Sequence, residues 1–280
     1  ARLKYINDRM STYLPESEIS RFNQTQNDDW FEVSPETAAV LGEALEISEK
    51  TAGAFDVTVG PLVNLWSFGP EGRHEEIPTD DEIEKAKADV GFRHVEVRSS
   101  PPALRKTFPD AYVDLSAIAK GYAVDEVARV MDGLGITRYM VEIGGEVRTR
   151  GRKQDGTFWR IGIEKPVSTA RVLQHIVELE DRALATSGDY RNFLEKDGQR
   201  YSHTIDPRTG RPVEHNLASA SVISDNCTFA DAMATALTVM GPDEAFRYAT
   251  NNDIDVLLII RVPDGFEVKT TKGFGGKAAQ

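Results

Sequence analysis

Alternating apolar and polar residues predict short strands in the second half of the chain. From Arg138 onward, these runs are separated by turns rich in Gly, Pro and Asp, a pattern typical of antiparallel pairing. A shorter run of the same kind covers Tyr112–Leu115, and the apolar run Val256–Ile260 predicts a buried strand. The other predicted strands are Tyr139–Ile143, Val147–Arg150, Phe158–Ile163, Gln174–Leu179, Tyr201–Ile205 and Ala218–Ile223.

Apolar residues at helical spacing, with capping residues at the ends, predict the helices. Ser34 with Pro35 indicates a start, and Thr79 with Glu82 forms a capping-box signature. The predicted helices run from Ser34 to near Gly53, from Thr79 to Gly91, from Ser116 to Gly133, from Thr228 to Met240 and from Pro242 to about Asn251. Helices and strands are segregated more than they alternate. We therefore expect an α+β fold, a mostly antiparallel sheet flanked by helices in a single compact unit.

Composition and charge exclude several classes of protein. Of the 280 residues, 40% are hydrophobic, which is enough for a sizeable core, and the formal net charge is −12. This acidic balance argues against nucleic acid as the main partner. No apolar run approaches the ~20 residues of a membrane-spanning helix. Cys227 is the only cysteine, which excludes an internal disulfide and disfavours a thiolate metal cluster.

Asp231 and Thr235 lie four residues apart in a helical run of small residues. A carboxylate and a hydroxyl therefore project from one helix face. Hard oxygen donors of this kind suit Mg²⁺, which usually takes one or two protein ligands besides phosphate oxygens and water. The alternative is structural, with the Asp capping a turn and the Thr bonding back to the helix backbone. Spacing alone leaves both open.

Three other segments combine polar residues with turn signals. Asp114 precedes a predicted helix start and Lys120 follows one turn in, which suits an anion or, equally, an ordinary strand-to-helix turn. Gly144-Gly145 interrupts a strand pattern, which indicates a bulge or a close approach to a ligand. His203 precedes an Asp-Pro turn, where it can be a general base or a structural hydrogen-bonding group.

Five segments, taken in order, resemble the FAD:protein FMN transferases of the ApbE family. The most specific are the Asp-Leu-Ser-Ala-Ile-Ala-Lys-Gly and His-Thr-Ile-Asp-Pro blocks. The resemblance runs from about Tyr5 to the C-terminus and implies one flavin-transferase domain over residues 1–280. The five segments are Met10–Tyr13 with Ser20–Asn23, Ala52–Pro61, Asp114–Asp125, His203–Gly210 and Ala230–Leu237.

The resemblance also assigns roles to residues. It implies an extended FAD groove and a Mg²⁺ ion near the pyrophosphate. The ion would be held by the Ala117 carbonyl and the side chains of Asp231 and Thr235. The residues implied in FAD binding are Tyr13 on the flavin side, Ala54, Phe55 and Asp56 along the cofactor, and Asp114, Lys120 and Ile205.

Family members move FMN from FAD to a Thr hydroxyl of an acceptor protein and release AMP. The acceptor Thr lies in an Asp-Gly-x-[Ser/Thr]-Gly-x-Thr type of motif. Mg²⁺ with Lys120 would neutralise the pyrophosphate, and His203 could accept the Thr proton. Two departures stand out: the family's usual Met-Gly-Thr segment does not precede Ala1, and Ala234 stands where some relatives carry another acidic ligand.

Two other functions suit the same residues. One is an FAD-binding or storage protein without transfer chemistry, and the other is a Mg²⁺-dependent FAD pyrophosphatase. The resemblance favours transfer, with an acceptor subunit of a redox-driven membrane complex as partner. It also implies a periplasmic enzyme, often anchored to the inner membrane by a lipid. We expect no nucleic-acid partner.

Overall fold

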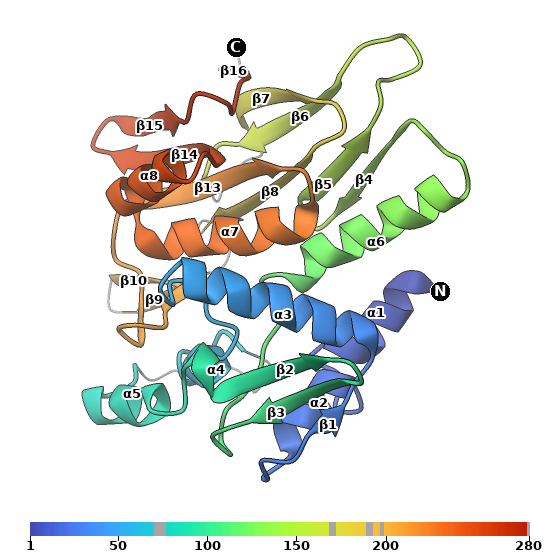
Figure 1. Ribbon diagram of the computed structural model, residues 1–280. Coiled ribbons are helices and arrows are strands. Elements are labelled where there is room, and N and C mark those ends of the chain that lie inside the picture. The colour runs from blue at the N-terminus through green and yellow to red at the C-terminus, as the bar shows by residue number, and fades with distance from the viewer. Residues whose placement is uncertain (70–76, 168–171, 189–192, 197–198, 279–280) are drawn as a thin grey trace. The chain divides into compact units, whose positions relative to one another are not determined.

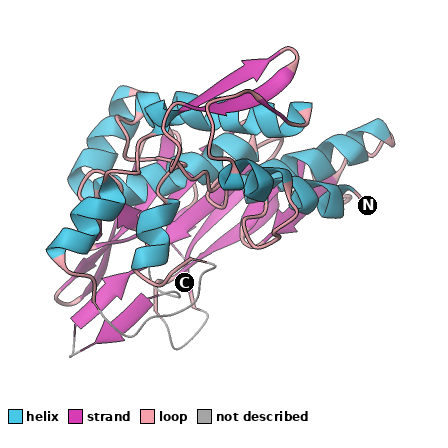
Figure 2. Ribbon diagram, turned by 90° about the horizontal axis from the view of Figure 1, so that it is seen from below, coloured by secondary structure: helices cyan, strands magenta, loops and turns pink. Residues whose placement is uncertain are grey.

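The computed structural model describes residues 1–69, 77–167, 172–188, 193–196 and 199–278 (Figure 1). The chain divides into two compact units, one of residues 1–119 and 205–213 and the other of residues 120–204 and 214–280. Both combine helices with antiparallel strands (Figure 2), which confirms the predicted α+β fold. That residues 1–280 act as one flavin-transferase domain stays a prediction.

The first unit is built on a small sheet in the order β1-β3-β2, and α3 packs against β2 and β3. The capping box at Thr79 is present as predicted at the start of α5. The helices of this unit are α1 (Arg2–Met10), α2 (Glu18–Gln24), α3 (Pro35–Lys50), α4 (Gly60–Leu65), α5 (Asp80–Lys87) and the short 3-10 helix η1 (Phe92–His94). Its strands are β1 (Phe31–Glu32), β2 (Val95–Ser99), β3 (Pro102–Lys106), β11 (Ile205–Asp206) and β12 (Arg211–Pro212).

The second unit contains a six-stranded sheet in the order β15-β14-β13-β8-β5-β4 and a three-stranded sheet in the order β16-β7-β6. Its helices are α6 (Ala119–Gly133), α7 (Cys227–Met240) and α8 (Pro242–Asn251). Its strands are β4 (Tyr139–Ile143), β5 (Glu146–Arg150), β6 (Trp159–Glu164), β7 (Leu173–Leu179), β8 (Ala183–Gly188), β9 (Phe193–Lys196), β10 (Gln199–Ser202), β13 (Leu217–Ser224), β14 (Asp255–Val262), β15 (Gly265–Thr270) and β16 (Lys277–Ala278).

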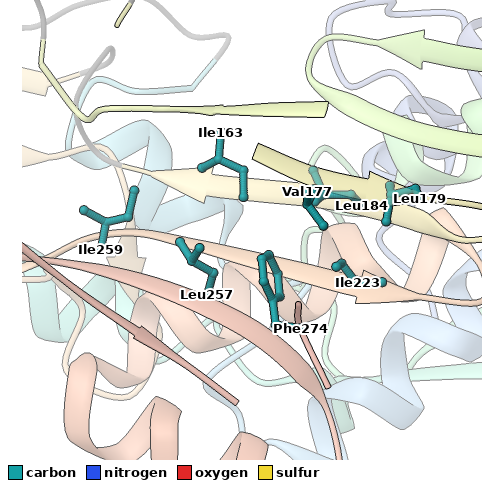
Figure 3. Packing of buried hydrophobic residues seen from close by; sticks show 8 residues of the cluster. All are labelled: Ile163, Val177, Leu179, Leu184, Ile223, Leu257, Ile259 and Phe274. Atoms are coloured by element: carbon teal, nitrogen blue, oxygen red, sulfur yellow. The ribbon is translucent and has the colours of Figure 1, made fainter. Parts of the chain in front are cut away.

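Apolar side chains pack the strands and helices of the second unit together. Residues of β6, β7, β8, β13 and β14 form one cluster together with Phe274 (Figure 3). Helix α7 packs on β8 and β13. A second cluster joins Val124 and Ala128 of α6 to Tyr139 and Val141 of β4 and to Cys227 at the start of α7. No helix among the described residues has the length and apolar character needed to cross a membrane.

Most of the predicted strands are present within one or two residues, but Tyr112–Leu115 was predicted wrongly. This segment is a loop, because the side-chain amide of Asn23 takes the place of a strand partner. The amide donates to the Val113 carbonyl at 2.8 Å and accepts from the Val113 N–H at 2.8 Å. The following helix begins at Ala119, because the Asp114 carboxylate accepts hydrogen bonds from Ser116 in a turn before it.

Helices α6 and α7 each supply a carboxylate to the other's first turn. Asp125 of α6 is buried and accepts from the backbone N–H groups of Cys227 and Thr228 at 2.9 Å. Asp231 of α7 accepts from the N–H of Gly121 at 2.9 Å. The N–H groups of a first helical turn have no partner in their own helix and favour negative charge. This reciprocal capping fixes the beginnings of the two helices against each other.

Arg148 of β5 pairs with Asp125, the carboxylate that caps α7. Its guanidinium lies 2.5 Å from the Asp125 carboxylate. Strand β5 lies between β8 and β4, which explains why Arg148 contacts a buried acid. Burial and the charge of Asp125 raise the pKa of the Cys227 thiol well above its ordinary value, so this cysteine packs as a neutral group.

We expect Asp125→Ala to lower the free energy of unfolding by about 3 kcal/mol, because it leaves Arg148 and two helix N–H groups without their partner. Urea unfolding measures this change. The control is Asp243→Ala, a 96%-exposed side chain in the first turn of α8, with an expected loss below about 1 kcal/mol. Equal losses in the two variants would contradict a special role for the buried cap.

Candidate functional site

One ammonium and two carboxylates meet in the second unit. Lys120, in the first turn of α6, places its Nζ 2.6 Å from Oε1 of Glu146 and 3.1 Å from Oδ1 of Asp231. Both acids are buried, whereas the Lys120 side chain is 46% exposed. The second Glu146 oxygen, Oε2, is buried without a hydrogen-bond partner in the described part of the chain. The cluster therefore carries two negative charges and one positive charge when all three groups are ionised.

Burial and mutual charge shift the ionisation of this cluster. Burial, followed by the charge of Asp231, raises the pKa of Glu146 to about 7, although Lys120 opposes the change. Desolvation acts to lower the pKa of Lys120, but the attraction of Asp231 and Glu146 outweighs it and the pKa rises above its ordinary value. Lys120 therefore keeps its proton at neutral pH. The two carboxylates therefore share the positive charge of one ammonium group.

A two-residue turn sets the position of Glu146. Gly144 and Gly145 both have positive φ values, +66° and +105°, and connect β4 to β5 with Ile143 opposite Glu146. The bulge considered from the sequence is wrong, because the pair forms a tight hairpin turn, which requires left-handed backbone at both positions. A close approach to a ligand stays a prediction. The carboxylate of Glu142 accepts from the Gly145 N–H at 2.7 Å. Glu146 is thus the first residue of β5.

Gly121 allows the two helices to approach closely. A Cβ atom at this position would collide with the backbone carbonyl of Cys227 and lie 2.8 Å from the Cβ of Asp231. The absence of a side chain therefore lets the Gly121 N–H reach the Asp231 carboxylate. This contact occupies Oδ2 of Asp231 and leaves Oδ1 facing Lys120.

Thr235 and His203 also belong to the second unit. Thr235 is partly exposed one turn after Asp231, and the regular helix α7 confirms that the two positions share a face. His203 is partly buried and lies directly after β10, so the predicted strand Tyr201–Ile205 is divided there into β10 and β11. The expected turn follows, with the N–H of Gly210 donating to the Asp206 carbonyl at 2.8 Å.

The remaining predicted residues lie in the first unit. Asp56 is buried and its carboxylate accepts from the Thr58 N–H at 2.7 Å, the Thr58 hydroxyl at 2.6 Å and the Phe92 N–H at 2.9 Å. Burial raises the pKa of Asp56 in spite of these hydrogen bonds. Ala54 and Phe55, just before it, are buried as well. This carboxylate organises the loop around it.

Asp114 adjoins the same loop, since its N–H donates to the Val57 carbonyl at 2.7 Å. Ala117 lies in the turn before α6 and is partly exposed. Ile205 is buried at the start of β11, opposite Pro212. Tyr13 is 64% exposed in the turn between α1 and α2, so its aromatic ring is available for contact. The predicted residues are thus divided between the two units.

Sequence reasoning missed Glu146. The two glycines before it were noticed, but nothing in the local pattern distinguishes a buried functional acid from a polar residue at a strand end. A signal was available in the hairpin, because a two-residue Gly-Gly turn places the next residue directly beside the preceding strand. The pairing with Lys120 bridges residues 26 positions apart and depends on the tertiary fold.

The cluster fits a hard divalent cation. No group of three or more His, Cys, Asp or Glu side chains arranged for a metal occurs among the residues that the structure describes. Asp231 and Glu146 carry carboxylate oxygens, the type of donor that Mg²⁺ prefers. Oε2 of Glu146 has no hydrogen-bond partner among the described residues, and a cation would compensate the excess negative charge beside Asp231.

Comparison with known proteins gives a consistent result. The family model described as ApbE family matches residues 1–258. The protein named FAD:protein FMN transferase from Vibrio cholerae serotype O1 is 49% identical over 272 residues, which cover 97% of this chain and 81% of the relative. Its counterpart of the same name from Escherichia coli K12 is 43% identical over 260 residues, 92% and 74% of the two chains.

The fold agrees with the sequence match. The solved structure of flavin transferase ApbE from Vibrio cholerae superimposes with a TM-score of 0.90 at 48% identity and covers 98% of this chain and 86% of that chain. Both comparisons extend over nearly the whole sequence, and they agree with the resemblance carried by the five segments. The chain therefore belongs to the ApbE family.

Proposed function

We propose that this protein transfers FMN from FAD to a threonine hydroxyl of an acceptor protein and releases AMP. The names of its relatives support flavin transfer from FAD to protein. The observation that carries the proposal within the chain is the cluster of Lys120, Glu146 and Asp231, because phosphoryl transfer needs fixed charge more than covalent catalysis. In this proposal, residues 1–280 work as one domain.

The proposed Mg²⁺ ion is held by the backbone carbonyl of Ala117 and the side chains of Asp231 and Thr235. All three supply oxygen, the donor that this ion prefers. When bound, the ion neutralises charge on the pyrophosphate and so makes its phosphorus accessible to an oxygen nucleophile. Lys120 adds a fixed positive charge from the protein.

The remaining residues bind FAD or move a proton. We assign FAD binding to Tyr13, Ala54, Phe55, Asp56, Asp114, Lys120 and Ile205, with the exposed ring of Tyr13 against the flavin. In the transfer, the threonine oxygen forms a bond to the FMN phosphorus while the bond from that phosphorus to the AMP oxygen breaks. His203 accepts the proton that the threonine loses.

Our proposals for the acceptor and the location are based on the family resemblance. We propose as partner a subunit of a redox-driven membrane complex that carries the threonine in a flavinylation motif. We further propose a periplasmic location, with a lipid anchor to the inner membrane. Labelling of intact cells with a reagent that does not cross the inner membrane tests the location.

Product analysis tests the activity and separates it from its alternatives. With FAD, Mg²⁺ and a flavin-acceptor domain, we expect an acceptor mass increased by FMN and an equal amount of AMP. Free FMN with AMP, independent of acceptor, would indicate a pyrophosphatase. FAD binding without any product would indicate a storage protein.

Asp231→Asn should lower Mg²⁺-dependent transfer by about 10²-fold, because the amide is a much weaker ligand for a hard cation. The amide oxygen can still accept from the Gly121 N–H, so the fold should survive. Circular dichroism and a Mg²⁺ titration of the rate check both expectations. Asp243→Asn, an exposed acid of the same unit, should transfer normally. An unchanged Mg²⁺ dependence in Asp231→Asn would remove this residue from the site.

Tyr13→Ala should raise the FAD concentration at half-maximal rate about 10-fold, because the flavin loses an aromatic contact. The maximal rate should stay the same, since the ring does not touch the phosphorus. Tyr13→Phe retains the ring and serves as the matched control. A fall in maximal rate with normal FAD affinity would show that this role is wrong.

His203→Ala should slow transfer by about 10²–10⁴-fold while FAD and Mg²⁺ still bind, because a general base contributes to the rate and little to binding. The melting temperature, the FAD dissociation constant and single-turnover transfer are to be measured on one preparation. A joint loss of stability and FAD affinity would instead indicate that His203 supports the turn at Asp206. Near-normal transfer at saturating FAD would exclude it as the base.

A further inference from the structure

Glu146 is the member of the charged cluster to which neither the sequence motifs nor the proposed reaction assigns a role. Only 3% of the residue is exposed, and its carboxylate makes the shorter of the two contacts to Lys120. Its second oxygen has no hydrogen-bond partner in the described part of the chain. A buried carboxylate with one unsatisfied oxygen destabilises the fold, so stability alone does not explain Glu146.

Lys120 and a divalent cation would compete for the same oxygen. Oδ2 of Asp231 already accepts from the Gly121 N–H, so we take Oδ1 as the oxygen that a metal ion would use. Oδ1 is also the atom that Lys120 contacts at 3.1 Å. Two cations on one carboxylate oxygen repel each other strongly at such distances. Lys120 therefore needs a second anion if it is to stay in the site when the metal is bound.

We propose that Glu146 is a positioning residue that gives the Lys120 ammonium a second anion, so that Lys120 can release Oδ1 of Asp231 when a divalent cation binds there. The inference rests on the proposed function, in which Asp231 is a metal ligand. Glu146 supplies the alternative anion at 2.6 Å, and the tight turn of Gly144 and Gly145 fixes its carboxylate at that place. Lys120 could then remain in the site when the metal ion is bound.

A double-mutant cycle tests the proposal. Mn²⁺, a spectroscopic substitute for Mg²⁺, is titrated into the full chain without FAD, and the free ion is followed by electron paramagnetic resonance. We expect Glu146→Gln to weaken Mn²⁺ binding about 10-fold, because Lys120 then pairs with Asp231 alone. Lys120→Met should strengthen binding, because the competing ammonium is absent. In the Lys120→Met background, Glu146→Gln should change binding less than about 2-fold.

Other roles of Glu146 give different results. Glu146 could instead be a metal ligand itself, or act only through its negative charge. In either case Glu146→Gln would weaken Mn²⁺ binding at least as much in the Lys120→Met background as in the unaltered protein, and this result would overturn the proposal. Unchanged binding in Glu146→Gln alone also overturns it. Circular dichroism checks folding of each variant, and Glu146→Ala replaces Glu146→Gln in the cycle if the latter unfolds.

The proposed metal site can fail separately. Mn²⁺ binding that is equal in the unaltered protein and in Asp231→Asn would reject Asp231 as a ligand, and with it both the metal site and this role of Glu146. Binding that depends on Asp231 but not on Glu146 would reject only the positioning role. Asp243→Asn is the control for a general loss of negative charge in this unit.

Discussion

The reciprocal capping of α6 and α7 is the constraint on which the second unit depends. Each helix begins with backbone N–H groups that need acceptors, and each finds its acceptor in a carboxylate of the other helix, Asp125 or Asp231. Because both caps are buried, neither helix can shift along the other without leaving polar groups unsatisfied. The relative position of the two first turns is therefore defined by hydrogen bonds as well as by apolar packing.

The same arrangement brings the charged groups together. Lys120 precedes Gly121 in the chain. The hydrogen bond from the Gly121 N–H to Asp231 therefore also places the Lys120 side chain near that carboxylate. Glu146 reaches the cluster from the neighbouring strand β5, whose Arg148 pairs with the other cap, Asp125. The charges that cap the helices and those of the Lys120 cluster thus lie on the same two helices and one strand.

Local sequence patterns predicted most helices and strands, because neighbouring residues determine where these elements begin and which faces they bury. The capping box at Thr79 and the shared face of Asp231 and Thr235 depend only on helix geometry and neighbouring residues. The failures involve partners distant in sequence. Asn23 replaces a strand partner for Val113, and no pattern around Tyr112–Leu115 could reveal it.

The residues of the candidate site also fall into those that the sequence reveals and those that depend on distant partners. The segments containing Asp114, Lys120, His203 and Asp231 could be found because they match a family in order along the chain. The Gly-Gly turn indicates only where Glu146 lies, since its significance arises from a buried contact with Lys120 and from an oxygen that has no hydrogen-bond partner among the described residues. The same holds for Arg148, because the order of strands in the sheet decides whether an arginine contacts solvent or a buried acid.

The hairpin at Gly144 and Gly145 has a consequence for how this sequence can vary. Side chains of a strand alternate between the two faces of a sheet, so one residue inserted here, with the turn kept at two residues, would shift the register of β5 by one and reverse the direction of Glu146. The same slip would turn Arg148 away from Asp125. Loops elsewhere can lengthen at little energetic expense, but this one has its length fixed by the two carboxylate contacts that follow it.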